Sequence, residues 1–121
     1  MKNFPLIFNN RDELVRVDLS KAVYFEAMGN YVNITFINGH TVMVLSSLLN
    51  IEKQFSNKIY EQAGFNFARI GKCFIINCQY ITQINIQKQE LVLSDLISPN
   101  VYVLNISKEA LKKLKSIYNK K

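Results

Sequence analysis

The chain has 121 residues, a net charge of +6 and 49% hydrophobic side chains. This composition predicts one globular domain with a single core and excludes an intrinsically disordered chain. Residues 1–60 carry six basic and five acidic side chains, against nine and four in residues 61–121. The positive charge of the second half favours nucleic acid or another polyanion as a partner. No apolar run is long enough for a signal peptide or a membrane-spanning helix, so we expect a cytoplasmic protein without membrane insertion.

The N-terminal segment predicts little regular structure. Residues 1–12 are polar and irregular apart from Pro5–Phe8, and we expect a leader or edge segment ahead of one domain over residues 13–121. Glu13–Leu19 alternates apolar and polar side chains, which is the pattern of a half-buried strand. Ala22–Ala27 is a second predicted strand.

The clearest hairpin follows. Tyr31–Ile37 and His40–Leu45 are predicted strands on either side of Asn38-Gly39, the pair most typical of a two-residue hairpin turn. Both central residues of such a turn need positive φ, which Asn and Gly tolerate best. A two-residue turn would give the hairpin one shared core face, made of Val32, Ile34, Phe36, Thr41, Met43 and Leu45.

The middle of the chain predicts a helix and a second hairpin. Ser46-Ser47 can cap a helix that ends before Gly64 and has one apolar stripe, formed by Leu48, Ile51, Phe55 and Ile59. Phe67–Ile70 then alternates like a strand, Gly71–Cys73 forms a tight turn, and Phe74–Ile76 returns as a buried run.

The C-terminal part predicts more strands and a final helix. Thr82–Gln87 and Leu91–Leu93 form a meander, and Val101–Ile106 is an apolar strand that we expect to be covered on both faces. Ser107 is placed to cap the helix. Its inward side chains should be Leu111, Leu114 and Tyr118, and its cationic stripe Lys108, Lys112 and Lys115. The predicted fold is therefore mainly β with small helices, a β-rich α+β class.

Side chains that carry catalysis are scarce. The single histidine, His40, directly follows a predicted turn, where an exposed structural role fits better than catalysis. Cys73 and Cys78 lack a second cysteine pair or a neighbouring histidine, so they fit small buried side chains in a reducing cytosol rather than a zinc site. We expect a protein that is not an enzyme and that needs no metal or cofactor. The alternative, an enzyme or ligand sensor, would need a pocket that gathers His40 or Cys73.

Three predicted turns carry hydrogen-bond donors instead: Gly29-Asn30-Tyr31, Gly71-Lys72-Cys73 and Asn105-Ile106-Ser107-Lys108. Asn can bond bidentately to adenine, and Lys can reach guanine or a phosphate oxygen. The N-terminus of the last helix can offer N–H groups to a phosphate. The alternative is a set of ordinary solvated loops beside a basic helix face.

Four stretches, in the same order, resemble the LytTR DNA-binding domain family. They are Val23-Tyr24-Phe25-Glu26-Ala27 with Gly29-Asn30-Tyr31-Val32, Ser47-Leu48 with Ile51-Glu52, Phe67-Ala68-Arg69-Ile70-Gly71-Lys72-Cys73-Phe74-Ile75-Ile76-Asn77, and Asn105-Ile106-Ser107-Lys108. The resemblance covers about residues 13–118. It implies a bacterial transcription regulator with an elongated fold of antiparallel sheets, whose loops, rather than a recognition helix, enter the grooves of double-stranded DNA.

By position, the resemblance implies three reading loops. The first holds Asn30 and Tyr31, with Asn33 nearby; the second holds Lys72, flanked by Arg69 and Gly71; the third holds Lys108 beside Ser107, with Lys112 on the same helix. We expect two copies on a repeated site, and a separate sensor or receiver protein as a further partner. Such domains commonly follow a receiver domain, so the chain is either an excised domain or a stand-alone member, and its Met1 start favours the latter.

Two departures from the family pattern bear on function. Gly71-Lys72-Cys73 stands where the family usually has His-Arg-Ser, and Lys108 stands where it has Arg. Lysine keeps the charge but loses the bidentate fork of arginine, which shifts weight from base reading to phosphate contact. The alternative function is a protein-interaction module of the same fold that has lost specific DNA reading.

Overall fold

The computed structural model describes residues 5–55 and 66–119. The strands are β1 (Pro5–Asn9), β2 (Leu14–Asp18), β3 (Ala22–Met28), β4 (Tyr31–Phe36), β5 (Thr41–Leu45), β6 (Phe67–Ile70), β7 (Phe74–Asn77), β8 (Ile81–Asn85), β9 (Glu90–Leu93) and β10 (Tyr102–Asn105). The helices are α1 (Leu48–Phe55), the short 3₁₀ turn η1 (Cys78–Tyr80) and α3 (Lys108–Asn119). The described residues thus confirm the predicted β-rich α+β class.

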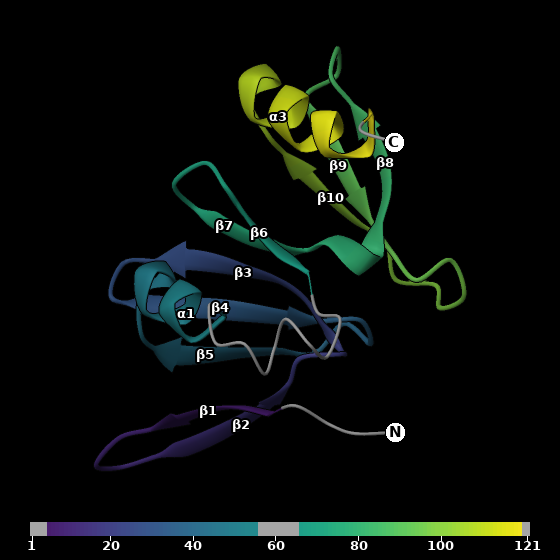
Figure 1. The fold of residues 1–121 in the computed structure, drawn as a ribbon. Helices are drawn as coiled ribbons and strands as arrows, with labels where there is room; N and C mark the ends of the chain where they lie inside the picture. The colour runs from purple at the N-terminus through teal and green to yellow at the C-terminus, as the bar shows by residue number, and fades with distance from the viewer. Residues whose placement is uncertain (1–4, 56–65, 120–121) are drawn as a thin grey trace.

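The strands form three antiparallel sheets that follow one another along an elongated molecule (Figure 1). A β1–β2 hairpin lies at one end, a five-stranded sheet of order β5-β4-β3-β7-β6 in the middle, and a three-stranded sheet of order β10-β9-β8 at the other end. Helix α1 covers one face of the middle sheet, and α3 lies on the three-stranded sheet. Segment Pro5–Asn9, part of the expected leader or edge segment, is a strand that pairs with β2 in this hairpin and buries Leu6 completely.

Two apolar clusters hold the sheets together. The first joins the middle sheet to α1 and the β1–β2 hairpin, and it is centred on Phe25, whose side chain is fully buried. The second joins the opposite face of the middle sheet to the three-stranded sheet and α3, through side chains such as Ile76, Leu91 and Leu111. Because both faces of the middle sheet are covered by apolar side chains, its strands are fixed from both sides.

The hairpin predicted at Asn38-Gly39 forms, but in a different register. Thr35 pairs with Thr41, and the Phe36 N–H donates to the His40 carbonyl at 2.8 Å. The loop therefore has three residues, 37–39, of which only Gly39 takes a positive φ, +91°. A three-residue loop that ends in a left-handed glycine is the next commonest hairpin connection, and the Asn-Gly pair alone does not distinguish the two.

This shift by one residue moves the side chains of β5 to the opposite face. Val42 and Val44, rather than Met43 and Leu45, share the core face with Val32 and Ile34. Met43 and Leu45 are 46% and 57% exposed. The predicted core face was thus right for β4 and wrong for β5.

The last strand and helix also differ from the prediction. Val101 and Val103 are more than half exposed, so β10 is covered on one face only, because Tyr102 and Leu104 alone face the second apolar cluster. Leu111 and Leu114 are buried as expected, whereas Tyr118 in the last turns of α3 is 48% exposed. The predicted continuation of α1 through Ile59, ending before Gly64, lies outside the described residues.

Asn77 at the end of β7 is a fully buried polar residue that joins distant turns. Its side-chain amide donates to the carbonyls of Ala22 at 2.9 Å and Leu19 at 3.4 Å, and its Oδ1 accepts from the Gln79 N–H at 3.1 Å. We predict that Asn77→Ala lowers the free energy of unfolding by about 1–3 kcal/mol, because it leaves buried backbone groups unpaired. Urea denaturation measures this, with the exposed Asn50→Ala as control; equal stability of the two variants would contradict the assignment.

Candidate nucleic-acid interface

The first candidate turn joins β3 to β4. Met28 pairs with Tyr31, which leaves a two-residue turn, Gly29-Asn30, with φ of +62° at Gly29. A glycine with positive φ at the first central position is what a tight turn of this length requires. Asn30 is exposed, Tyr31 is 45% exposed, and Asn33 lies half-buried further along β4. Two polar side chains and one aromatic ring are therefore presented at or near this end of the middle sheet.

The second candidate turn joins β6 to β7. Ile70 pairs with Phe74, so the turn consists of Gly71, Lys72 and Cys73, and all three residues are exposed. Gly71 has a φ of +61°, and a Cβ placed there would meet nothing within 4 Å, so the turn stands clear of the protein. The Ala27 N–H donates to the Cys73 carbonyl at 2.9 Å, which ties this turn to the end of β3 and hence to the first turn.

Arg69 precedes the second turn and is engaged within the protein. Its guanidinium forms an ion pair with Glu52 of α1 and donates through Nη2 to the Lys72 carbonyl at 3.1 Å. The neighbouring side chain of Ile70 points to the opposite face of β6 and is buried. Arg69 thus lies beside the candidate interface with its donors directed at α1 and at the turn.

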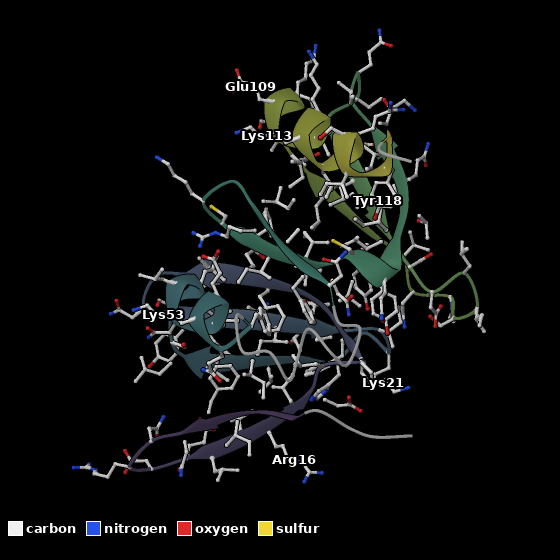
Figure 2. The ribbon with its side chains drawn as sticks, in the orientation of Figure 1. Arg16, Lys21, Lys53, Glu109, Lys113 and Tyr118 are labelled. Carbon is white, nitrogen blue, oxygen red and sulfur yellow. The ribbon has the colours of Figure 1, made fainter. Side chains whose placement is uncertain are left out.

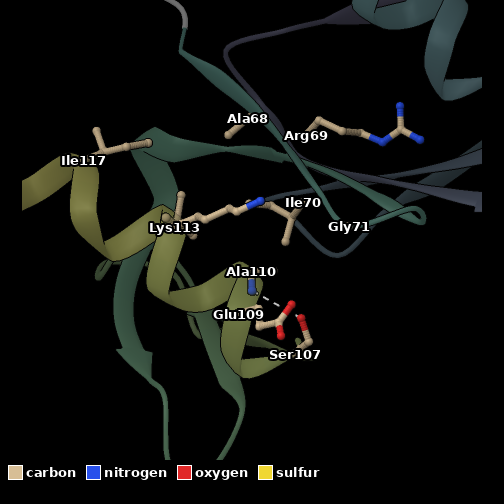
Figure 3. A pocket seen from close by; sticks show the side chains of 10 residues that line it. Ala68, Arg69, Ile70, Gly71, Ser107, Glu109, Ala110, Lys113 and Ile117 are labelled. Atoms are coloured by element: carbon tan, nitrogen blue, oxygen red, sulfur yellow. Dashed lines mark hydrogen bonds between the residues drawn. The ribbon is translucent and has the colours of Figure 1, made fainter.

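The third candidate segment is the N-terminus of α3. The Ser107 Oγ accepts from the Ala110 N–H at 3.2 Å, which confirms Ser107 as the helix cap. Lys108 and Lys112 are exposed and lie one turn apart along the helix. An open hollow of about 450 Å³ separates this segment from the second turn, and it is lined by residues of both, including Gly71, Ser107 and Lys113 (Figure 3).

The three segments lie along one edge of the molecule. In Figure 1 the β3 arrowhead, the β6–β7 turn and the first turn of α3 share the left-hand side. The Ala27–Cys73 hydrogen bond joins the first segment to the second, and the shared hollow joins the second to the third. The structure therefore brings the three predicted segments to one edge, with Asn33 set further into the sheet and Arg69 turned toward α1. On α3, the charged side chains that line the hollow are Glu109 and Lys113, and not Lys108 or Lys112.

Two lysines that the sequence analysis left out also border this edge. Lys113 reaches across the hollow toward Ile70 (Figure 3), and no carboxylate of the described residues lies within ion-pair distance of it. Lys88, in the turn between β8 and β9, borders the start of α3 together with Ser107. Lys113 is off the stripe of Lys108, Lys112 and Lys115, so helical periodicity alone would have placed it on another face.

The residues considered for catalysis remain apart. His40 borders a separate hollow, with Arg16 and Lys21, at the end of β4 opposite to Tyr31. Burial raises the pKa of the Cys78 thiol, which keeps it protonated at neutral pH. Within residues 5–55 and 66–119, no group of three or more His, Cys, Asp or Glu side chains is placed to hold a metal ion. In the same part of the chain, none of the helices has the length and apolar character needed to cross a bilayer.

Fold and site together define an elongated β-rich module with polar and basic turns along one edge. The model of the LytTr DNA-binding domain matches residues 12–119, so the chain belongs to this family. A solved LytTr DNA-binding domain from Bacillus cereus has the same fold, with a TM-score of 0.65, 19% sequence identity and 98% of each chain covered. The search of curated proteins finds no match. Membership supports a DNA-binding role in transcription regulation and confirms the resemblance drawn from the four sequence stretches.

Proposed function

We propose that the chain reads duplex DNA sequence-selectively through three turns rather than through a recognition helix. The observation that carries this proposal is the common edge shared by the β3–β4 turn, the β6–β7 turn and the start of α3. A straight duplex is a polyanionic rod, so contacts that act together must lie along one line of the protein surface.

Each turn has a distinct role in this proposal. Asn30, Tyr31 and Asn33 offer an amide pair and a ring to base edges and sugars, as Asn does with adenine. Lys72, lifted by Gly71, enters the central groove. Lys108 and Lys112, with the helix end capped by Ser107, contact the third segment of DNA mainly through phosphates. Lys113 and Lys88 add positive charge beside the second and third segments.

The proposal also covers where the protein acts, how many copies bind and which partner controls it. The module acts without catalysis, in the cytoplasm, and two copies bind a repeated site. A separate sensor or receiver protein controls it. The DNA-binding family and the charge of the chain support these statements, and each needs its own measurement.

The test is selection from random duplex DNA followed by a salt titration on the selected site. We predict that one sequence is enriched and that log K falls linearly with log[salt], with a slope of about −0.9 for each phosphate contacted. Enrichment of no sequence, with equal affinity for all duplexes, would contradict sequence-selective reading. A slope near zero would contradict phosphate contact altogether.

A second candidate is a protein-interaction module that has lost specific DNA reading. One observation favours it: Leu96 and Ile97, between β9 and β10, are 82% and 91% exposed. Adjacent exposed aliphatic side chains of this kind are typical of protein contacts. A competition experiment distinguishes the two candidates. Unlabelled duplex should displace labelled DNA from a DNA-reading protein, whereas it should leave a protein partner bound to an interaction module.

A further inference from the structure

Arg69 links three parts of the protein around the central turn. Its Nη1 pairs with Oε1 of Glu52 on α1, and its Nη2 donates to the carbonyl of Lys72 at 3.1 Å. A planar guanidinium can serve both acceptors at once with fixed geometry, which an ammonium group cannot do. The arginine is thus a two-point connection between a helix and the backbone of the turn.

The two ends of this connection differ in rigidity. On α1, Phe55 stacks on Phe67 of β6 with ring centroids 4.4 Å apart and planes 11° apart, so helix and strand are fixed together. The turn itself has no packing of its own around Gly71, where a Cβ would meet nothing within 4 Å. Its described backbone anchors outside the hairpin ladder are the Arg69–Lys72 bond and the Ala27–Cys73 bond at 2.9 Å.

We infer that Glu52 and Arg69 form a clamp that positions the Lys72 turn for DNA, with Arg69 acting through the turn backbone as a positioning residue. A turn ordered in advance loses less conformational freedom when Lys72 binds DNA. In this role the carboxylate of Glu52 supports the binding of a polyanion although it carries the same sign of charge. The inference rests on the proposed function for its consequence in DNA binding, but the clamp itself exists without DNA.

Because Glu52 is negatively charged, the variant Glu52→Ala distinguishes the clamp from simple electrostatic repulsion. Coulomb's law alone predicts that removal of a negative charge near the interface tightens DNA binding. The clamp predicts the opposite: affinity for the selected duplex falls by about threefold to tenfold, the cost of ordering one rotamer-rich side chain on binding. Alanine favours α1, so the helix should persist. Glu13→Ala, in the exposed β1–β2 turn, is the matched control for lost negative charge and should leave affinity unchanged or tighten it.

Arg69→Lys separates positioning from direct contact. Lysine keeps the charge for a phosphate but cannot hold Glu52 and the Lys72 carbonyl together. The clamp predicts weaker specific binding with an unchanged salt slope, whereas a direct phosphate contact predicts that this variant binds like the wild type. Arg16→Lys is the control, because Arg16 lies on β2 near the β4–β5 turn, away from the β6–β7 turn. This variant should bind DNA like the wild type.

A measurement without DNA completes the test. Backbone order parameters from NMR should fall at Gly71–Cys73 in both Glu52→Ala and Arg69→Lys, and remain unchanged in the two controls. Unchanged order and unchanged affinity in both clamp variants would overturn the inference. If the wild type binds no duplex, the proposed function fails, and the order parameters then decide by themselves whether the clamp exists.

Discussion

Replacement of Lys72 and Lys108 together by alanine is expected to weaken binding to the selected duplex through two different losses. Lys72, as a base reader, contributes about 1–3 kcal/mol, and loss of the Lys108 phosphate contact adds a sequence-independent weakening and reduces the salt slope by about 0.9. The two side chains are exposed and belong to different segments of the same edge, one in the β6–β7 turn and one at the start of α3. Truncation of exposed side chains should leave the stability of the fold nearly unchanged. Fluorescence anisotropy with labelled duplex measures the loss at fixed salt.

The matched control removes the same charge from the other end of the molecule. Arg16 and Lys21 are exposed and line the hollow near the β4–β5 turn, away from Glu109 and Lys113 (Figure 2). Arg16→Ala with Lys21→Ala should weaken binding only slightly, through the smaller long-range attraction. An equal loss of affinity in the two double variants would mean that net charge, and not the proposed edge, determines binding.

The second large effect is on stability, at the centre of the first core cluster. Phe25 is fully buried and packs edge-on against Phe55 at 5.7 Å and Phe67 at 6.0 Å between ring centroids. Phe25→Ala should lower the free energy of unfolding by about 3–5 kcal/mol, because it removes buried surface and leaves a cavity. The same aromatic cluster joins β3, α1 and β6, so the variant should also loosen the strand that carries Arg69.

Urea denaturation followed by circular dichroism measures this loss. Leu14→Ala on β2, where the side chain is 60% exposed, is the control and should change stability by no more than about 0.5 kcal/mol. A loss in Phe25→Ala similar to that of the control would contradict the central position of Phe25 in the core.

Local sequence patterns predicted strands and helix starts correctly where residues close in sequence determine the structure. Alternation identified β2, and the Ser107 cap identified the start of α3, because each is set by residues within one turn or strand. The register of the Asn38-Gly39 hairpin failed because two loop lengths suit the same dipeptide. What selects the three-residue loop is tertiary: Val42 and Val44 must face the same core as Val32, and the Asn100 amide bonds the Ile37 carbonyl at 3.1 Å.

The candidate site was predictable as a set of turns but not as a surface. Gly29, Gly71 and Ser107 mark the three segments because glycine and serine have local roles in turns and caps. The ion pair between Glu52 and Arg69 joins residues 17 positions apart through the packing of α1 on β6, which no spacing rule gives. Lys113 belongs to the edge only because α3 lies beside the β6–β7 turn.

The central claim is that three separate segments meet one duplex at the same time. An NMR titration of the isotope-labelled protein with the selected duplex tests it most directly. We predict chemical-shift changes or protection at Gly29–Tyr31, Gly71–Cys73 and Ser107–Glu109, with none at Lys21 or at residues 37–39. Changes confined to one segment, or centred on the opposite end of β4, would contradict the account.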